Sequence, residues 1–165
     1  MDRLWAPWRI KYIRNIGKVS RLKKEGCIFC KAASLKAKDY VILKTKYSLS
    51  MLNIFPYNNG HSMVAPIKHI AALHELKEAQ VIDLFKTLLK TKELLDKVLK
   101  PKGYNIGINI NDIAGAGIPE HLHIHIVPRW KGDTNFITTV ANTKVISQSL
   151  GELYKQLKYA QSKSD

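Results

Sequence analysis

The sequence predicts an α+β domain, an antiparallel sheet of about five strands packed against one long helix and a C-terminal helix. Three observations lead to this fold class. Short alternating segments are separated by turn residues, residues 76–99 have helical spacing, and residues 121–130 alternate strictly between polar and apolar side chains. With 165 residues, the whole chain 1–165 suits a single domain with one core.

Four further segments complete the predicted sheet and its turns. Strands are expected at residues 40–44, 47–54, 61–66 and 104–111. The second and third are joined by the turn 56–60, whose Asn-Gly pair supplies a positive φ at little cost.

Two amphipathic segments predict the helices. The apolar side chains of the long one are Val81, Leu84, Phe85, Leu88, Leu95, Val98 and Leu99. Pro101 and Gly103 end this helix. The C-terminal helix uses Ile146, Leu150, Leu153 and Leu157, and the tail 162–165 is expected to fray.

The stretch 121–130 is the most informative part of the chain. Its polar positions are His121, His123 and His125, and its apolar positions are Leu122, Ile124 and Ile126. The pattern predicts a half-buried strand with three imidazoles on one face, which Pro128 ends because it lacks an N–H. Neighbours on one face of a strand lie roughly 6–7 Å apart, so adjacent histidines can serve one small site without all binding the same ion. Three surface histidines with no function are the plain alternative.

Composition narrows the class of protein. Lysine and arginine total 27 against 13 acidic residues, a net charge of +14, which favours polyanionic partners and equally favours solubility. No apolar run approaches a membrane span, and the charged N-terminus has no apolar segment of a secretory signal behind it. Two cysteines make no disulfide framework, so the cytoplasm is the expected compartment.

Residues 1–26 form a basic N-terminal arm with three aromatic side chains, Trp5, Trp8 and Tyr12. The arm suits packing over its own domain or a partner subunit, and contact with nucleic acid is the alternative. A nucleic-acid partner is disfavoured because the sequence contains no recognised nucleic-acid-binding motif.

The sequence His-Leu-His-Ile-His-Ile-Val at 121–127 resembles the signature of the histidine triad (HIT) superfamily of nucleotide hydrolases and nucleotidyl transferases. The longer stretch 120–136 and the opening 1–9 are similar to the bacterial branch that contains diadenosine tetraphosphate phosphorylases. The resemblance implies the HIT-like fold and a homodimer, or higher homo-oligomer, in which two sheets become continuous.

The same resemblance implies roles for individual residues. His123 would be the catalytic nucleophile that attacks the α-phosphate, His125 would bind and neutralise the phosphate, and His61 would line the pocket. Asn53 would hold the ribose and Asn109 would contact the nucleotide, although either can simply pin a loop. Apolar side chains such as Leu52 and those near Val41 are expected to sandwich the base.

Gly117 departs from the family pattern. Many triad hydrolases have Gln, and some phosphorylases Ser, at this position four residues before the first histidine. Backbone N–H groups of Ala116, Gly117 and Ile118 can instead form an anion-binding nest. Together with Arg129 and Lys131 this nest predicts an entrance for inorganic phosphate.

The pair Cys27 and Cys30 is too short to make a zinc site alone, and His69 and His121 are the plausible completing ligands. Family members with this Cys-x-x-Cys opening hold one structural zinc through two cysteines and two histidines, and no organic cofactor is expected. Two inert thiols are the alternative, and His74 is interpreted as a surface residue.

The function favoured by these observations is a nucleotidyl-transferring phosphorylase, which converts diadenosine tetraphosphate and phosphate to ADP and ATP through a nucleotidyl-histidine. The alternatives are a hydrolase of diadenosine polyphosphates or of nucleoside phosphoramidates. From other classes, the alternatives are a basic nucleic-acid-binding protein and a nucleotide sensor without turnover.

Overall fold

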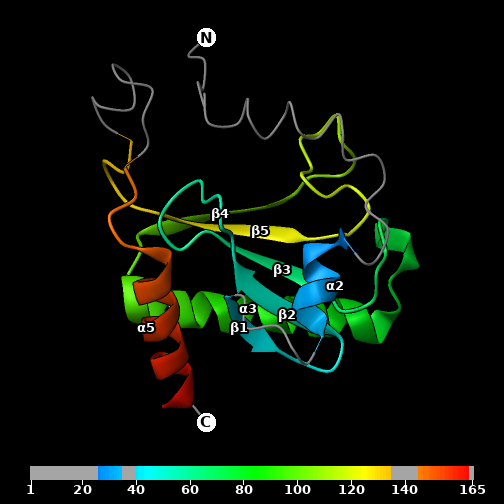
Figure 1. Ribbon diagram of the computed structural model, residues 1–165, viewed down its shortest axis with the longest axis horizontal. Helices are drawn as coiled ribbons and strands as arrows, with labels where there is room; N and C mark the ends of the chain where they lie inside the picture. Colours follow the sequence, from blue (N-terminus) through cyan, green and yellow to red (C-terminus); the bar gives the residue numbers. More distant parts are fainter. Residues whose placement is uncertain (1–25, 35–39, 135–144, 164–165) are drawn as a thin grey trace.

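A computed structural model describes residues 26–34, 40–134 and 145–163 (Figure 1). Its centre is an antiparallel sheet of five strands in the order β1-β2-β3-β5-β4. The strands are β1 (Val41–Lys44), β2 (Ser48–Leu52), β3 (Ser62–Pro66), β4 (Gly103–Ile108) and β5 (Ile124–Arg129). The helices are α2 (Ile28–Ala33), the 3₁₀ turn η2 (Leu73–Glu75), α3 (Glu78–Leu99) and α5 (Leu150–Ser162). The α+β class and the sheet predicted from the sequence are confirmed.

The main core lies between one face of the sheet and the helices α3 and α5, which Figure 1 shows on the same side of the strands. Alternate residues of β2, β3 and β5 point to this side, which is the period-two pattern expected of strands. The strand residues of this core are Ile42, Leu52, Val64, Ile124 and Ile126, and the helices contribute Leu84, Leu88, Leu94, Leu95, Leu153 and Leu157.

The opposite face of the sheet carries a smaller core under α2. Phe29 and Ala32 of α2 pack there against the other alternating set of strand residues, Leu49, Met51, Met63 and Ala65. The histidine side chains of the 121–125 segment lie on this face too, because Ile124 and Ile126 occupy the main core. Six residues are too few for a periodic signal, and α2 was not predicted from the sequence.

Strand β5 differs from the prediction in two ways. It begins at Ile124, so His121 and His123 precede it, and it continues through Pro128, which pairs with Tyr104 of β4. The proline is tolerated because pairing with β3 already ends at Ile126. Because β5 is an inner strand with helices on both faces of the sheet, the half-buried strand is a wrong prediction. The exposed fractions of His121 and His123 are 0% and 3%.

Helix α3 begins two residues later than predicted and ends where predicted, at Leu99, with Lys100 in the left-handed region. Leu84, Leu88 and Leu95 are buried as their spacing predicts. Val81 and Phe85, which belong to the same apolar stripe, are 38% and 53% exposed, so the domain does not cover the whole stripe.

Several predicted boundaries also change. β2 is shorter than the predicted 47–54, and β4 ends at Ile108, three residues before the predicted end. Ile146 precedes α5, which begins after the N-cap Ser149, whose side-chain oxygen accepts the N–H of Glu152. Ser162 is still helical, while residues 164–165 and the arm up to residue 25 lie outside the described residues.

Candidate active site and metal centre

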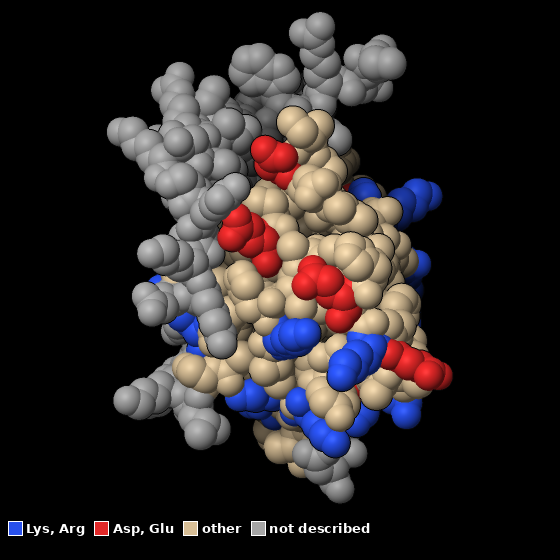
Figure 2. All heavy atoms as spheres, turned by 90° about the vertical axis from the view of Figure 1, so that its right-hand side faces the viewer, with Lys and Arg blue, Asp and Glu red and all other residues tan. Residues whose placement is uncertain are grey.

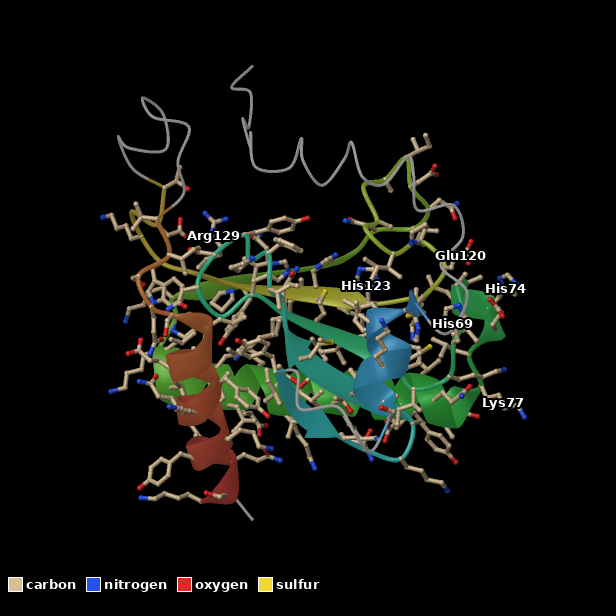
Figure 3. The ribbon with its side chains drawn as sticks, viewed as in Figure 1. His69, His74, Lys77, Glu120, His123 and Arg129 are labelled. Atoms are coloured by element: carbon tan, nitrogen blue, oxygen red, sulfur yellow. The ribbon has the colours of Figure 1, made fainter. Side chains whose placement is uncertain are left out.

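One end of the histidine row belongs to a cluster of four metal-binding side chains, Cys27, Cys30, His69 and His121. Their ligand atoms all lie within 4.8 Å of one another. Cys27 caps the N-terminus of α2 and Cys30 lies within that helix, while His69 follows β3. Figure 3 shows His69 beside α2. The fold thus brings together the four residues that the sequence suggested for a metal.

The geometry of the cluster fits a tetrahedral ion. Cys27 Sγ and Cys30 Sγ lie 3.2 Å and 3.7 Å from His121 Nδ1, and Cys30 Sγ lies 3.2 Å from His69 Nδ1. Bonds of about 2.0–2.3 Å to zinc place ligand atoms about 3.4–3.8 Å apart at tetrahedral angles, close to these distances. A donor set of two sulfurs and two imidazoles is typical of Zn²⁺.

The ring of His121 is oriented by main-chain contacts. Its Nε2–H donates to the carbonyl of Pro66 at 2.8 Å, which leaves Nδ1 unprotonated and facing the cysteines. Burial is the largest influence on this imidazole and lowers its pKa to about 4. A neutral ring with its lone pair on Nδ1 is the form that ligates a metal.

His123 has the opposite tautomer. Its Nδ1 lies 2.8 Å from the carbonyl oxygen of His121, which can only accept, so the proton resides on Nδ1 and Nε2 carries the lone pair. Burial lowers the pKa of His123, and the ring of Phe29 packs against it with centroids 5.0 Å apart. A buried neutral imidazole with a bare Nε2 is a competent nucleophile near pH 7.

His125 and His61 form the next pair, with His61 Nε2 2.9 Å from His125 Nδ1. The backbone N–H of Tyr57 donates to His61 Nδ1 at 3.0 Å, which assigns the proton of His61 to Nε2. His61 therefore donates to His125 Nδ1, and the neutral His125 carries its proton on Nε2. Burial, with smaller effects of His125 and His123, lowers the pKa of His61 to about 3. The rings of His123 and His125 lie 4.8 Å apart.

The two predicted nucleotide-binding asparagines also make local contacts. Asn53 follows β2, and its side-chain oxygen accepts the N–H of Phe55 at 2.9 Å. Its amide nitrogen lies 3.4 Å from His61 Nδ1, which places Asn53 beside the histidine cluster. Asn109 lies just beyond β4, where its amide donates to the carbonyl of Gly115 at 3.4 Å.

The predicted anion nest loses one of its three amides. The N–H of Ala116 donates to the carbonyl of Asn111 at 3.3 Å, so it is already used inside the loop. Gly117 and Ile118 are half-buried between this loop and the histidine segment.

The predicted phosphate entrance also changes, because the guanidinium of Arg129 makes a bidentate ion pair with Asp133. Figure 3 shows Arg129 at the end of β5 away from His123. Both predicted basic residues are exposed, Arg129 at the end of β5 and Lys131 in the turn that follows. His74 lies in η2 and is exposed, as interpreted from the sequence.

The predicted base contacts need a correction. Leu52 is fully buried in the main core on the α3 side, away from the histidines, so it cannot sandwich a base. Val41 packs against the smaller core under α2, on the histidine face.

Sequence reasoning missed Phe29 and Tyr57. The ring of Tyr57 stacks on His61 at 4.6 Å between centroids and an interplanar angle of 27°. Their positions in the sequence could have indicated both, although weakly. Phe29 lies between the two cysteines, and Tyr57 lies in the turn before His61.

The charge is not spread as one basic surface. Figure 2 shows acidic side chains over the upper and middle part of one face and most of the basic ones below them. Among the described residues, no helix is long and apolar enough to cross a membrane.

Comparisons with known proteins agree with this fold. The family model "HIT domain" matches residues 34–132. A Mycobacterium tuberculosis protein named AP-4-A phosphorylase is 34% identical over 162 residues, covering 95% of this chain and 83% of the relative. A Saccharomyces cerevisiae adenosine 5'-monophosphoramidase is 29% identical over 131 residues, covering 79% and 80% of the two chains.

A third relative, the asymmetrical bis(5'-nucleosyl)-tetraphosphatase of Schizosaccharomyces pombe, is 36% identical over 93 residues, 56% of this chain and half of its own length. Among solved structures, a zinc-bound histidine triad family protein from Mycobacterium smegmatis superposes with a TM-score of 0.70 at 26% identity, covering 87% of this chain and 98% of its own. The chain therefore belongs to the HIT domain family.

Proposed function

We propose that the protein is a phosphorylase of dinucleoside polyphosphates, which converts diadenosine tetraphosphate and inorganic phosphate to ATP and ADP. The observation that carries this proposal is the unprotonated Nε2 of His123, whose ring is kept neutral by burial and oriented by the His121 carbonyl. The Mycobacterium tuberculosis relative, named AP-4-A phosphorylase, supports the choice of substrate.

In the first step, Nε2 of His123 attacks the α-phosphorus and the bond to the bridging oxygen of the departing ATP breaks. The imidazole gains positive charge as the P–N bond forms, and the His121 carbonyl accepting from Nδ1–H stabilises that charge. The N–H on Nε2 of His125 is the neighbouring donor for phosphate oxygens.

In the second step, an oxygen of inorganic phosphate attacks the adenylyl group, the P–N bond breaks and ADP leaves, so His123 returns to its neutral form. Water in place of phosphate would give AMP. We favour phosphate because the side chain that many hydrolases place at position 117 is absent, and because the chain carries a net charge of +14.

Product analysis tests the acceptor. Diadenosine tetraphosphate is incubated with the protein at zero and millimolar phosphate, with the same reactions on His123→Ala as background. We expect ATP and ADP in equal amounts and a rate that rises with phosphate. If AMP dominates at both phosphate concentrations and the rate ignores phosphate, the protein is a hydrolase. A parallel reaction with adenosine 5'-phosphoramidate tests the activity of the phosphoramidase relatives.

We further propose one structural zinc per chain, held by Cys27, Cys30, His69 and His121 with no open position for substrate. The zinc-bound Mycobacterium smegmatis protein supports this assignment. We assign the reaction to the cytoplasm because Cys27 and Cys30 must stay reduced to bind the metal.

The partner of the chain is a second copy of itself. β4 lies at the edge of the sheet, and its Ile106 is 49% exposed. Ile106 pairs with Ile126, which points into the main core, so its side chain lies on the α3 side of the sheet. Four large apolar residues of α3 are also exposed, Val81, Ile82, Phe85 and Leu89. An unpaired strand edge next to this apolar helix surface suits a dimer in which two sheets join, which sedimentation of the full chain would measure.

A further inference from the structure

Asp133 lies in the turn after β5, and its side chain is only 8% exposed. Its carboxylate accepts Arg129 Nε–H at 2.6 Å on Oδ2 and Arg129 Nη2–H at 2.9 Å on Oδ1. The backbone N–H of Trp130 also donates to Oδ2, at 3.2 Å. A carboxylate this buried is stable because charged and polar donors surround it.

A further donor to this carboxylate comes from the turn between β2 and β3. Asn58 Nδ2 lies 2.8 Å from Asp133 Oδ2 and 3.0 Å from the carbonyl oxygen of Pro128. Asn58 is 6% exposed, so the two hydrogens of its amide are directed to acceptors of the β5 segment rather than to solvent. The turn that contains Asn58 is thereby fixed to the end of β5.

That turn determines how His61 is presented. The carbonyl of Asn58 accepts the backbone N–H of His61 at 3.1 Å, and the N–H of Tyr57 donates to His61 Nδ1. Gly60 closes the turn with φ of +76°, and a Cβ there would lie 2.4 Å from Leu99 Cδ1 and 3.1 Å from Pro128 Cγ. The turn therefore packs tightly, with little room to move once Asn58 is held.

We propose that Asp133 is a positioning residue for the reaction, which acts through Asn58 to hold the Tyr57–His61 turn and so fixes the donor tautomer of His61 toward His125. Asp133 is linked to the histidines by three hydrogen bonds in sequence, Asp133 to Asn58, Asn58 to His61 and His61 to His125.

A carboxylate suits this position because Arg129, Trp130 and Asn58 all present donors to it. An amide at position 133 would present its own N–H groups to Asn58 or Arg129, and at least one of those donors would lose its acceptor. The charge of Arg129 is thus paired with Asp133 and helps to hold this turn.

The test is Asp133→Asn in the full chain, compared with Asn105→Ala. Asn105 Oδ1 accepts Nη1–H of the same Arg129 at 2.7 Å, and the structure gives it no bond to the turn, so it is a matched control. Long-range ¹H–¹⁵N spectra of the imidazoles report the tautomers of His61 and His125 without substrate. Kinetics on diadenosine tetraphosphate are followed as dinucleotide consumed.

We expect Asp133→Asn to show a second tautomer of His61 and a kcat lowered about tenfold with KM within twofold, because small misplacements of catalytic groups cost rate rather than binding. Asn105→Ala should resemble the parent in both readouts. Unchanged spectra with kcat within twofold of the parent would overturn the proposal, even if the melting temperature falls. If Asp133→Asn does not fold, Asn58→Ser is judged by the same two readouts.

The kinetic measurement rests on the proposed function, because it uses diadenosine tetraphosphate as the substrate. The imidazole spectra are recorded without substrate and do not depend on it. A protein that released AMP instead of ADP would refute phosphorolysis and leave the role of Asp133 standing. Normal tautomers in Asp133→Asn would refute the role of Asp133 whichever product forms.

Discussion

The two ends of the histidine row hold the same side chain in opposite tautomers. At one end, His121 donates Nε2–H to the Pro66 carbonyl and turns Nδ1 to two thiols. Two residues later, His123 donates Nδ1–H to the His121 carbonyl and keeps Nε2 bare. Neither ring is more than 3% exposed. The contrast shows that the acceptor for one ring nitrogen, rather than residue type or burial, decides which nitrogen of each ring is left unprotonated.

The sharpest test of this division removes the metal end. Chelation or Cys27→Ser should lower the melting temperature markedly, because structural zinc can contribute on the order of 10 kcal/mol of binding free energy. The protein that remains folded should keep its tautomer at His123, since that bond runs to a main-chain oxygen.

Ser34→Ala is the matched control, since its exposed hydroxyl bonds only the carbonyl of Lys31 at the end of α2. Metal analysis after purification without chelator should give one zinc per chain. A zinc content well below one per chain would show that the four-residue cluster does not hold a structural zinc.

The second test removes the reactive end. His123→Ala should lower kcat by several orders of magnitude and leave the Kd of a non-hydrolysable dinucleotide nearly unchanged, because a nucleophile is lost and the pocket is not. Zinc content should stay at the parent's value. The exposed His74 gives the control His74→Ala. Activity within tenfold of the parent would show that His123 is not the nucleophile.

The third test uses acid, and its effect is the smallest. The pKa of His61 is about 3 in the folded protein, against 6.5 for an ordinary histidine. Between these two pH values the unfolded chain therefore binds a proton at this residue that the folded chain does not. The free energy of unfolding should therefore fall as the pH drops from about 6.5 toward 3, by up to about 1.4 kcal/mol per pH unit from this group.

His61→Gln replaces the imidazole with an amide, which still offers a donor and an acceptor but does not titrate. Its free energy of unfolding should decline less steeply between pH 6 and pH 5, where carboxylates barely titrate. Denaturant titrations of both proteins across that interval measure the difference. Equal slopes would show that His61 is not held neutral by the fold.

The sequence predicted the sheet, the long helix and the cluster of metal ligands, because each leaves a local mark, such as alternation along β5 or the Cys27–Cys30 spacing. The sequence could not tell which face of the sheet each residue of β2 meets, because that strand is buried at every position. Leu52 and Met51 are both apolar and differ only in which face of the strand they occupy. Periodicity in α3 likewise cannot distinguish a stripe covered by the domain from one left exposed, as at Phe85.

The site was only partly predictable for a related reason. A sequence shows that Arg129 is positive, but which acceptor it meets depends on the turn that brings Asp133 back to it. The tautomers of His61 and His123 depend on main-chain atoms of Tyr57 and His121, which every sequence has at every position.

The bond that orients His123 ends on a peptide oxygen, which no amino-acid substitution can delete. Neither an alanine scan nor any library of genetically encoded substitutions can therefore reveal this bond, because each variant keeps the carbonyl. Replacing the peptide bond after His121 with an ester, by chemical ligation of a depsipeptide, weakens that carbonyl as an acceptor and leaves every side chain intact. It also removes the Leu122 N–H, which donates to the carbonyl of Ile70 at 2.7 Å. Semisynthesis is thus the way to measure how much the backbone contributes to the reactivity proposed for His123.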